Sequence, residues 1–369
     1  MPTSRQRGPV KYAVVGLGHI AQVAVLPAFT HAKRNSRLAA LVSDDAQKRR
    51  VLSRKYRVDK TYAYKDYEAC LAEVDAVYIA LPNSMHAEYT IRAARAGVHV
   101  LCEKPMAVTV EECEAMIDAC REHGVKLMIA YRLHFEEINL KVIDLVRKGR
   151  IGVPKFFNSS FSLTVRAGNI RTEKELGGGS LHDIGVYCIN AARHLFRAEP
   201  KEVMAISVNS GAAKLSEIDE STAAALRFDG ERVAAFVTSF NAADVGSYRI
   251  VGTKGDVRVD PAYEYAGRLA YELTIDGKTT RKRIGKRDQF AAELLYFSDC
   301  IRHNRQPEPS GEDGLQDVRV VQALYQSAES GKAVPIPPFR AAKQPTGRQR
   351  IRRPGVAEPA LVKVKSASE

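Results

Sequence analysis

Two short stretches of the sequence carry the side chains best suited to acid–base chemistry. They are CEKPMAV, with the charged pair Glu103 and Lys104, and GGGSLHDIGVYCIN, with Asp183 and Tyr187 four positions apart. Residues i and i+4 share one face of a helix, so Asp183 and Tyr187 can point into the same cleft. Lys104 in the first stretch could hold a substrate hydroxyl and lower the pKa of a neighbouring acid. The plainer alternatives are a surface salt bridge for the charged pair and a flexible loop for the three glycines.

A glycine motif follows the first predicted strand. The run VKYAVV leads into GLGHIAQ, which places Gly16, Gly18 and Ala21 in the spacing G-x-G-x-x-A between a strand and a helix. In dinucleotide-binding folds the first glycine permits the tight turn, the second lets the backbone approach a pyrophosphate, and the third position allows close helix packing. We therefore predict a dinucleotide site, with a structural glycine turn as the alternative. The predicted contacts are Gly16, Gly18, His19 and Ile20.

The end of the second predicted strand bears on which dinucleotide binds. An acidic residue there binds the ribose 2′-hydroxyl of NAD, whereas a small polar residue with nearby cations suits the 2′-phosphate of NADP. In ALVSDDAQKRR, Ser43 stands at the strand end and Lys48 follows with two arginines, while Asp44 and Asp45 favour NAD. A solvated helix face would explain part of this positive charge. The balance favours NADP, with contacts at Ser43 and Lys48.

The next two strand ends extend the predicted cofactor site. Ligands of open α/β sheets bind at the carboxyl ends of the strands. The stretch ALPNSMHAE ends one strand and begins a helix, and CEKPMAV ends the following strand. A lone histidine at a helix start is more often a cap or a packing residue than a catalyst, so His86 is kept as a cofactor neighbour only. The predicted contacts here are Leu81, Pro82, Asn83, His86, Glu103 and Lys104.

The elements that must position these residues follow two patterns. To about residue 133, short apolar strands alternate with helices, which predicts a parallel sheet wound by right-handed crossovers. From residue 155 the runs are β-rich with turn residues between them, which predicts a mostly antiparallel sheet. The predicted fold class is therefore α/β. An N-terminal Rossmann dinucleotide-binding domain (residues 1–133) precedes a C-terminal α+β substrate and oligomerisation domain with an open, mostly antiparallel sheet (residues 134–338).

Composition narrows the class of protein. A chain of 369 residues is too long for one ordinary core, and 45% hydrophobic with 27% charged residues is typical of soluble globular proteins. We see no apolar run of ~20 residues, so no membrane partner is expected. The start lacks the ~7–15-residue apolar core of a signal peptide, which favours a cytoplasmic location. The six cysteines show neither CxxC nor zinc-like spacing, so we expect reduced thiols and no metal site.

The last residues differ from the rest. The formal net charge is +13, and residues 339–369 are rich in Lys, Arg, Pro, Gln and Ser without periodicity. This composition predicts a basic, disordered tail. Such a tail could bind nucleic acid or an acidic surface, but no nucleic-acid fold motif accompanies it. We therefore expect a solubilising tail and no specific nucleic-acid partner.

Several motifs together resemble the glucose–fructose oxidoreductase, inositol dehydrogenase and MocA (Gfo/Idh/MocA) family. They are GLGHIA, LPNSMHAE, EKP, MIAYR and GGGSLHDIG, in order over roughly residues 10–335. The likeness is greatest to the glucose–fructose oxidoreductase branch. The resemblance implies a site in the cleft between the two domains and pyridine-nucleotide hydride transfer on sugars, polyols or related ketones. It also implies homodimers or homotetramers formed through the sheet.

The resemblance also assigns roles. Lys104 matches the catalytic lysine of the EKP motif, Asp183 the aspartate of the second-domain motif, and Tyr187 stands where many members have histidine. In this scheme Tyr187 takes or gives the hydroxyl proton, Lys104 stabilises the tyrosinate, and Asp183 orients a neighbouring hydroxyl. The catalytic residues are thus predicted to be Lys104, Tyr187 and Asp183. The YR pair Tyr131–Arg132 and Arg171, beside the glycines, are expected near cofactor and substrate.

The expected function is NADP(H)-dependent hydride transfer to or from a sugar or a sugar-like alcohol or ketone. An aldose dehydrogenase, a sugar–sugar oxidoreductase and an anhydro-ketose reductase all fit. The branch's Trp-Arg pair is replaced by Ile170-Arg171, and its Pro-rich arm is missing. An exchangeable cofactor is therefore as compatible with the sequence as a tightly held one. The alternative from another class is a non-catalytic sugar- or nucleotide-sensing protein on the same scaffold.

Overall fold

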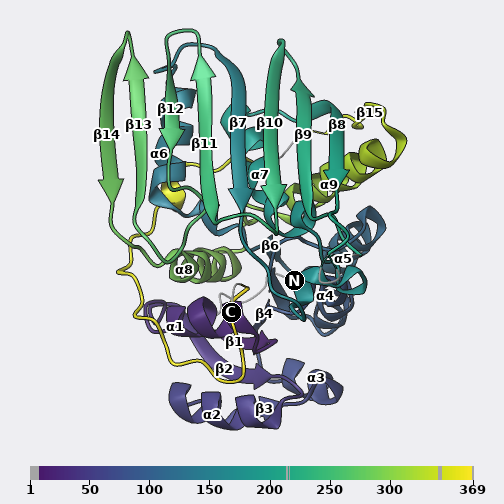
Figure 1. Cartoon of the computed structure of the whole chain (residues 1–369). Helices are drawn as coiled ribbons and strands as arrows, with labels where there is room; N and C mark the ends of the chain where they lie inside the picture. The colour runs from purple at the N-terminus through teal and green to yellow at the C-terminus, as the bar shows by residue number, and fades with distance from the viewer. Residues whose placement is uncertain (1–7, 213–214, 216, 340–342, 368–369) are drawn as a thin grey trace.

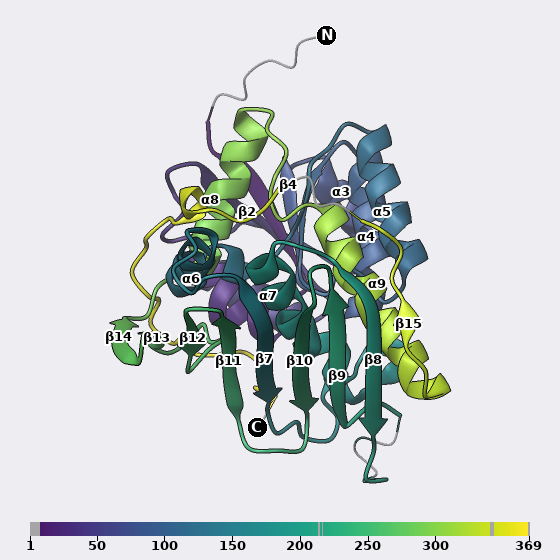
Figure 2. The same ribbon diagram turned by 90° about the horizontal axis from the view of Figure 1, so that it is seen from above.

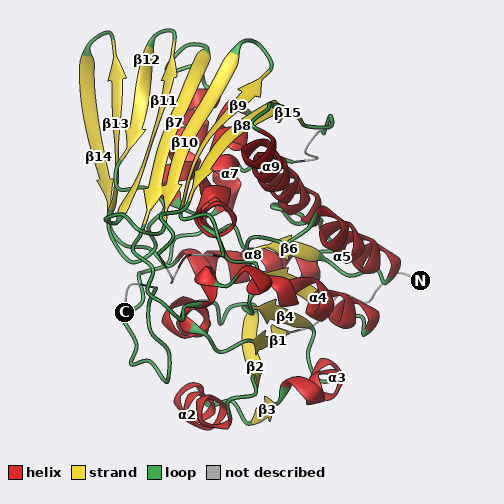
Figure 3. Cartoon of the chain, turned by 45° about the vertical axis from the view of Figure 1, so that its right-hand side comes forward, coloured by secondary structure: helices red, strands yellow, loops and turns green. Residues whose placement is uncertain are grey.

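The chain forms two β-sheets with helices packed between and around them (Figure 1). The computed structural model describes residues 8–212, 215, 217–339 and 343–367. In the view of Figure 3 the larger sheet lies above and the smaller sheet below, with helices between the two layers. The two candidate chemical stretches therefore belong to different layers, and the fold must bring them together.

The N-terminal sheet is parallel throughout, as predicted. Its strand order is β3-β2-β1-β4-β5-β6, the arrangement of doubly wound dinucleotide-binding domains. Ligands of such sheets bind where the strand order reverses, which is here between β1 and β4. The strands are β1 Val10–Val15, β2 Ser36–Val42, β3 Lys60–Tyr62, β4 Ala76–Ile79, β5 His99–Cys102 and β6 Leu127–Ile129.

Helices connect these strands. They are α1 Leu26–Ala28, α2 Ala46–Tyr56, α3 Tyr67–Leu71, α4 His86–Arg95 and α5 Val110–Glu122. Helix α2 and strand β3 give only weak signals in the sequence. Helix α2 buries only Leu52, so it has almost no apolar stripe from which helical periodicity could be read. Strand β3 is three residues long and half-exposed, which gives too short a pattern for prediction.

The C-terminal sheet has nine strands in the order β14-β13-β12-β11-β7-β10-β9-β8-β15. Among the described strands of this sheet only β7 and β10 pair in parallel, so the predicted mostly antiparallel sheet is confirmed. The strands are β7 Pro154–Ser162, β8 Pro200–Val208, β9 Ser221–Phe228, β10 Arg232–Ser239, β11 Val245–Gly252, β12 Gly255–Val259, β13 Leu269–Ile275, β14 Lys278–Ile284 and β15 Val334–Pro335.

One face of this sheet is covered by helices and the other is open (Figure 2). The covering helices are α6 Glu137–Arg147, α7 Val186–Phe196 and α9 Gly311–Ser330. Strand side chains alternate accordingly. On β8, for example, Val203 and Ala205 are buried whereas Met204 and Ile206 are exposed. Helix α7, which follows the glycine-rich stretch, is thus fixed against the sheet along its length.

Helix α8 (Gln289–Arg302) returns to the N-terminal sheet. It falls within the span assigned to the second domain, but it packs on the N-terminal sheet. The hydroxyls of Tyr12 on β1 and Ser298 on α8 lie 2.8 Å apart, and Asn35 Nδ2 donates to the Leu295 carbonyl at 2.9 Å. Because one face of that sheet would otherwise be bare, the chain returns to cover it. A boundary read from the order of elements does not detect such a return.

The described residues of the tail are hydrogen-bonded to the rest of the protein. Gln349 Nε2 donates to the Glu308 carbonyl at 3.2 Å, Asp288 N donates to the Arg353 carbonyl at 3.2 Å, and Val362 N donates to Gln22 Oε1 at 2.8 Å. These anchors are hydrogen bonds rather than buried apolar side chains. A prediction of disorder from low hydrophobicity therefore misses them. No helix among the described residues is long and apolar enough to cross a membrane.

Candidate active site

Lys104 and Asp183 meet where the two domains contact each other. Lys104 follows β5, and Asp183 lies in the π-helical turn Leu181–Gly185 that opens α7. Lys104 Nζ donates to Asp183 Oδ1 at 3.0 Å and to the Asp183 carbonyl at 2.7 Å. The two predicted catalytic stretches, 79 positions apart in the chain, are thus joined by direct contacts.

Tyr187 lies one helical turn beyond Asp183 and is flanked by two cations. Lys104 Nζ is 4.7 Å from the centroid of the Tyr187 ring, and the Arg132 guanidinium carbon is 5.0 Å from it. The ring is 7% exposed. Cations over a shielded ring interact strongly with it, and they would also stabilise negative charge on its oxygen. The structure therefore brings Lys104, Asp183 and Tyr187 into one group, as their spacing in the sequence suggested.

Asp183 is clamped by a cation on each oxygen. Arg171 Nε donates to Oδ2 at 2.6 Å, while Lys104 holds Oδ1. Burial alone would raise the pKa of Asp183, but Arg171 and Lys104 outweigh it and hold that pKa well below its usual range. Asp183 is consequently an ionised acceptor at neutral pH and not a proton donor.

Lys104 keeps its positive charge because the negative charge of Asp183 lies beside it. Burial would lower the pKa of the Lys104 ammonium, but the carboxylate of Asp183 and the neighbouring Tyr187 and Glu103 more than offset it, so this pKa is raised. Lys104 is therefore a permanent cation of the site rather than a base.

The glycine run lets the second domain reach the edge of the first. Asn83, just beyond β4, donates from Nδ2 to the Gly177 carbonyl at 2.8 Å. Gly177 has φ +77°, and a Cβ there would lie 2.8 Å from Asn83 Cβ and Val108 Cγ2. No larger residue allows this approach. The run is thus a close contact between the domains, which rules out the plain flexible-loop alternative.

Asp219 is a site-shaping residue that the sequence reading missed. Its Oδ2 accepts from Ser180 Oγ at 2.6 Å and from Leu181 N at 2.8 Å, and its Oδ1 accepts from Tyr325 Oη at 2.6 Å. It therefore fixes the start of the helical segment that carries Asp183. Asp219 comes from the loop between β8 and β9, and nothing in its local sequence signals this partner.

The phosphate loop has the geometry that a pyrophosphate needs. Gly16 has φ +92°, and a Cβ there would lie 2.4 Å from the Ala80 carbonyl oxygen, so only glycine fits between β1 and β4. At Gly18 a Cβ would meet no atom within 4 Å, so this backbone faces open space. His19 and Ile20 begin the helical segment that follows. The residues present therefore fit the dinucleotide phosphates.

At the end of β2, the two aspartates that favoured NAD are engaged elsewhere. Asp44 Oδ1 accepts from Tyr64 N at 2.7 Å, and Asp45 caps α2 by accepting from Gln47 N and Lys48 N at 2.9 and 3.0 Å. Ser43 is buried at the strand end. The structure thus uses both carboxylates to hold the backbone and leaves Lys48 in the first turn of α2.

Two predicted cofactor neighbours support the strand ends from within. His86 is fully buried, with Nδ1 2.9 Å from the Pro105 carbonyl and Nε2 3.0 Å from the Leu81 carbonyl, so it ties the loops after β4 and β5 together. Glu103 Oε1 accepts from Tyr78 Oη at 2.7 Å, and burial raises the pKa of Glu103. Both side chains therefore stabilise the loops at the carboxyl ends of β4 and β5, where the cofactor is expected to bind. Leu81 and Pro82 lie with Asn83 at the carboxyl end of β4, as expected.

Arg132 connects the site to the returning helix. It lies in the 3-10 turn Arg132–His134 after β6 and is 5% exposed. Its Nη1 donates to Gln289 Oε1 at 2.9 Å and to the Glu264 carbonyl at 3.2 Å. Its neighbour Tyr131 is buried. Arg132 therefore holds the loop after β12 beside Tyr187 and α8.

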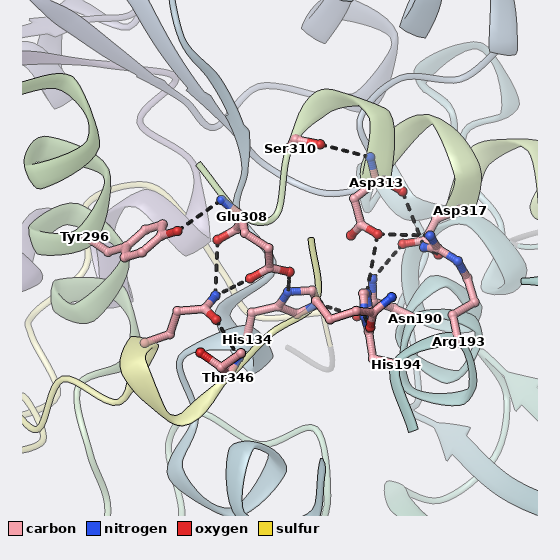
Figure 4. Close-up of polar contacts among 12 residues, drawn as sticks. His134, Asn190, Arg193, His194, Tyr296, Glu308, Ser310, Asp313, Asp317 and Thr346 are labelled. Atoms are coloured by element: carbon pink, nitrogen blue, oxygen red, sulfur yellow. Dashed lines mark hydrogen bonds and ion pairs between the residues drawn. The ribbon is translucent and has the colours of Figure 1, made fainter. Parts of the chain in front are cut away.

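A buried polar cluster behind the site joins the turn after β6 to α7 and α9 (Figure 4). His134 Nδ1 lies 2.7 Å from Glu308 Oε1, and its Nε2 lies 2.7 Å from Asn190 Oδ1. The Asn190 amide donates to Asp317 at 2.8 Å, which turns its carbonyl oxygen toward His134. Both imidazole nitrogens thus face acceptors, so the ring is a doubly protonated cation. Burial lowers the pKa of His134, but Glu308 outweighs it and raises this pKa to about 9.

The same cluster contains four possible metal ligands, which the sequence did not predict. They are His134, His194, Glu308 and Asp313. The nitrogens of His134 are used in hydrogen bonds, and Arg193 Nη2 donates to Asp313 Oδ1 at 2.9 Å. The Arg193 guanidinium at that position already supplies the positive charge that a metal ion would bring. The cluster is therefore an ion and hydrogen-bond network that holds α7 and α9 in place.

A wound parallel sheet with a glycine phosphate loop, and a cleft that pairs a buried lysine with a tyrosine, define a nicotinamide-dinucleotide oxidoreductase. More specifically, the chain belongs to the Gfo/Idh/MocA family of oxidoreductases. The family model described as "Oxidoreductase family, NAD-binding Rossmann fold" matches residues 10–131, and the "GFO/IDH/MocA C-terminal domain" matches residues 139–258.

Three similar proteins show the extent of the likeness. D-xylose 1-dehydrogenase [NADP(+)] from Haloarcula marismortui is 33% identical, over 88% of this chain and 93% of its own. The crystal structure of aldose–aldose oxidoreductase from Caulobacter crescentus complexed with glycerol is 38% identical with a TM-score of 0.85, covering 89% of this chain and all of that one. A 3-ketoreductase from Actinomadura kijaniata, in complex with NADP and TDP-benzene, is 26% identical with a TM-score of 0.79, covering 87% and 98%.

Proposed function

We propose that this protein is an NADP(H)-dependent oxidoreductase that transfers hydride to or from a sugar or a sugar-like alcohol or ketone. The observation that carries the proposal is the group formed by Lys104, Asp183 and Tyr187 at the phosphate-loop edge of the N-terminal sheet. It supplies two fixed charges and one exchangeable proton in a cleft with a dinucleotide loop.

The roles follow from the geometry and charges. The nicotinamide, when bound, supplies or accepts the hydride. Tyr187 exchanges the proton of the reacting hydroxyl, and Lys104 with Arg132 stabilises negative charge on the phenol oxygen as that proton leaves. Asp183 stays ionised and accepts a hydrogen bond from a neighbouring substrate hydroxyl.

The relatives support the substrate class and the residue types. The xylose dehydrogenase and the aldose–aldose oxidoreductase are both named for action on aldoses. Solved structures of the Actinomadura kijaniata ketoreductase include a variant with one lysine changed to alanine and another with one tyrosine changed to phenylalanine. These are the two residue types that flank each other in the cleft of this chain.

NADP is favoured over NAD by the surroundings of Ser43. The nearby carboxylates of Asp44 and Asp45 bind backbone N–H groups, whereas Lys48 and Arg49 place positive charge beside the strand end. The xylose dehydrogenase and the ketoreductase are also named with NADP. We further propose a cytoplasmic location, since all six cysteines are free and buried.

Turnover assays test the proposed function. The purified protein is mixed with NADP or NAD and a panel of aldoses, and with NADPH and a panel of anhydro-ketoses and lactones, while nicotinamide absorbance is followed. We expect turnover with NADP(H) and at least one sugar, with a lower kcat/KM for NAD(H). Binding of cofactor and sugar by calorimetry without any turnover would instead support the non-catalytic sensing alternative.

A further inference from the structure

The C-terminal strap, defined here as residues 355–367, runs along the cofactor side of the N-terminal domain. It belongs to the yellow C-terminal segment that descends from the larger sheet toward the N-terminal domain in Figure 1. Lys55 Nζ on α2 donates to the Ala360 carbonyl at 3.0 Å. Val362 is held in both directions, because its N–H donates to Gln22 Oε1 at 2.8 Å and its carbonyl accepts from Gln22 Nε2 at 3.0 Å.

Gln22 lies in the helical turn that follows the phosphate loop. It is 1% exposed, and its Nε2 also donates to the Leu17 carbonyl at 2.9 Å. Leu17 stands between the two motif glycines, Gly16 and Gly18. One amide side chain therefore links the strap directly to the loop that fits the pyrophosphate.

The far end of the strap is anchored on the other domain. The Ala367 carbonyl accepts from Arg166 N at 3.0 Å, and Ala367 packs against the apolar cluster that contains Val165 and Ile184. Only four residues lie between this anchor and Val362. The strap thus spans from the phosphate-loop helix to the domain that carries Asp183.

A strap lysine lies at the strand end that selects the dinucleotide. Lys363 Nζ is 3.6 Å from Asp45 Oδ2, and its side chain is 55% exposed. Asp45 is the residue that caps α2 through Lys48 N. Lys363 therefore adds a third cation, after Lys48 and Arg49, around the loop that follows Ser43.

We propose that the C-terminal strap is part of the NADP site: Lys363 binds the 2′-phosphate together with Ser43 and Lys48, and the strap retards release of the bound cofactor. The inference rests on the proposed function and deepens it. A phosphate dianion matches the cations that gather here: it would replace Asp45 Oδ2 as the partner of Lys363, while Asp44 Oδ1 and Asp45 Oδ1 stay bound to backbone N–H groups. A segment bonded to both domains must detach from one of them before a dinucleotide beneath it can leave.

Truncation after Pro354 tests the retention. This variant lacks the strap but keeps the anchors at Gln349 and Arg353. Both proteins are saturated with NADP, desalted and analysed for bound nucleotide, and release is timed by displacement of NADPH fluorescence. We expect the full chain to retain NADP and the truncated chain to release it ~10-fold faster or more. Equal release rates would overturn the proposal.

A point substitution tests the phosphate contact without removing the strap. Lys363→Ala should weaken NADP binding about 3- to 10-fold by calorimetry, as an exposed charge-assisted contact allows, and leave NAD binding unchanged. Lys365→Ala is the matched control, because it removes an exposed cation from the same strap. An equal loss for NADP and NAD, or the same loss in the control, would contradict the assignment to Lys363.

Failure of the strap and failure of the proposed function give different results. If the full chain binds neither NADP nor NAD in calorimetric titration, the proposed function fails. If it binds NADP and the truncated chain binds and releases it identically, only the strap proposal fails. Circular dichroism of the truncated chain verifies the fold, and Lys363→Glu provides a full-length variant that should weaken NADP binding further than Lys363→Ala.

Discussion

At the scale of single residues, Asp183 helps to set the charge of its neighbour Lys104. It binds Lys104 on one oxygen and Arg171 on the other, and these cations hold its pKa below the usual range. Asp183 in turn helps to raise the pKa of Lys104. In the proposed reaction the proton that moves is therefore assigned to Tyr187, whereas Asp183 and Lys104 keep fixed charges through neutral pH.

Asp183→Asn should shift the alkaline side of the pH profile. Without the carboxylate, burial lowers the pKa of Lys104 with less opposition, so the ammonium is lost at a lower pH than in the parent. The kcat/KM of the variant should therefore fall earlier as pH rises, with a loss of ~10-fold or more at neutral pH. Its pH profile is compared with that of Asp183→Glu, which restores the charge and should recover part of the activity. An unchanged alkaline limb would contradict this coupling.

At the scale of elements, the phosphate loop and the glycine run are close contacts that only glycine allows. Gly16 approaches the Ala80 carbonyl, and Gly177 approaches Asn83. The first joins two strands of one sheet, and the second joins the two domains. The phosphate loop and the loop that leads into α7 are thus set by backbone approach rather than by side-chain packing.

Gly16→Ala should abolish tight dinucleotide binding. The added Cβ would lie 2.4 Å from the Ala80 carbonyl oxygen, so the loop must move away from β4. We expect the NADP dissociation constant to rise ~10-fold or more in calorimetry, because the N–H groups no longer converge on the phosphates. Gly97→Ala is the matched control: it also has positive φ, but its Cβ meets no atom within 4 Å. Equal binding by both variants would refute the steric argument.

Local pattern was enough for the parts of the site that depend on neighbouring residues in the chain. The G-x-G-x-x-A spacing, the strand ends at Ser43 and Asn83, and the i, i+4 pair Asp183 and Tyr187 are all short-range signals. What could not be predicted depends on contacts distant in sequence. Asp219 reaches the catalytic helix from another loop, and α8 returns to the first sheet.

The tail shows the same limit in another form. Its composition is that of a disordered segment, yet its described residues are fixed by hydrogen bonds to Gln22, Lys55 and Arg166. Composition reports how much apolar surface a segment can bury, not which polar partners a fold offers it. The segment after β2 is a second example of polar partners that composition does not reveal. Only the structure shows that the carboxylates of Asp44 and Asp45, next to Ser43, accept hydrogen bonds from backbone N–H groups.

At the scale of the whole molecule, the polar cluster around His134 should make stability depend on pH. Its folded pKa of about 9 lies above the ordinary value, so the folded state holds a proton that the unfolded state releases. This contribution is complete below about pH 6.5 and is lost as pH rises through 9. Glu308 contacts the His134 ring, His194 packs edge-on against that ring, and Asp313 Oδ1 lies 3.4 Å from His194 Nε2.

Thermal unfolding measured at pH 6.5 and at pH 9.5 tests this expectation. The melting temperature of the parent should fall between pH 6.5 and pH 9.5. That of His134→Gln should fall less, because residue 134 then has no proton to release over this interval. His123→Gln, at an exposed position, should behave as the parent does. An identical pH dependence in the parent and His134→Gln would contradict the assignment.

The open face of the larger sheet predicts self-association. Exposed apolar residues gather there on four strands, and patches of this kind mark protein interfaces. We propose that two copies pair through this face to form a homodimer, or a homotetramer by a second contact. The residues are Phe156, Met204, Ile206, Val208, Val233, Val237 and Val245.

Light scattering coupled to gel filtration measures this assembly. Ile206→Lys with Val237→Lys should convert the oligomer to a monomer, because two charges would be buried in the interface. Val51→Lys, which adds a charge to α2 at an exposed position, should leave the mass unchanged. A parent that elutes as a monomer at micromolar concentration would remove the basis for this prediction.

The central claim is that Tyr187 exchanges the proton while the cofactor carries the hydride. The most direct measurement is the single-turnover rate of nicotinamide reduction by Tyr187→Phe, loaded with NADP and mixed with the sugar that the parent oxidises. The account predicts a rate lowered by ~10²-fold or more, with NADP affinity within about 2-fold of the parent, because only the proton donor is lost. A rate close to that of the parent would contradict it.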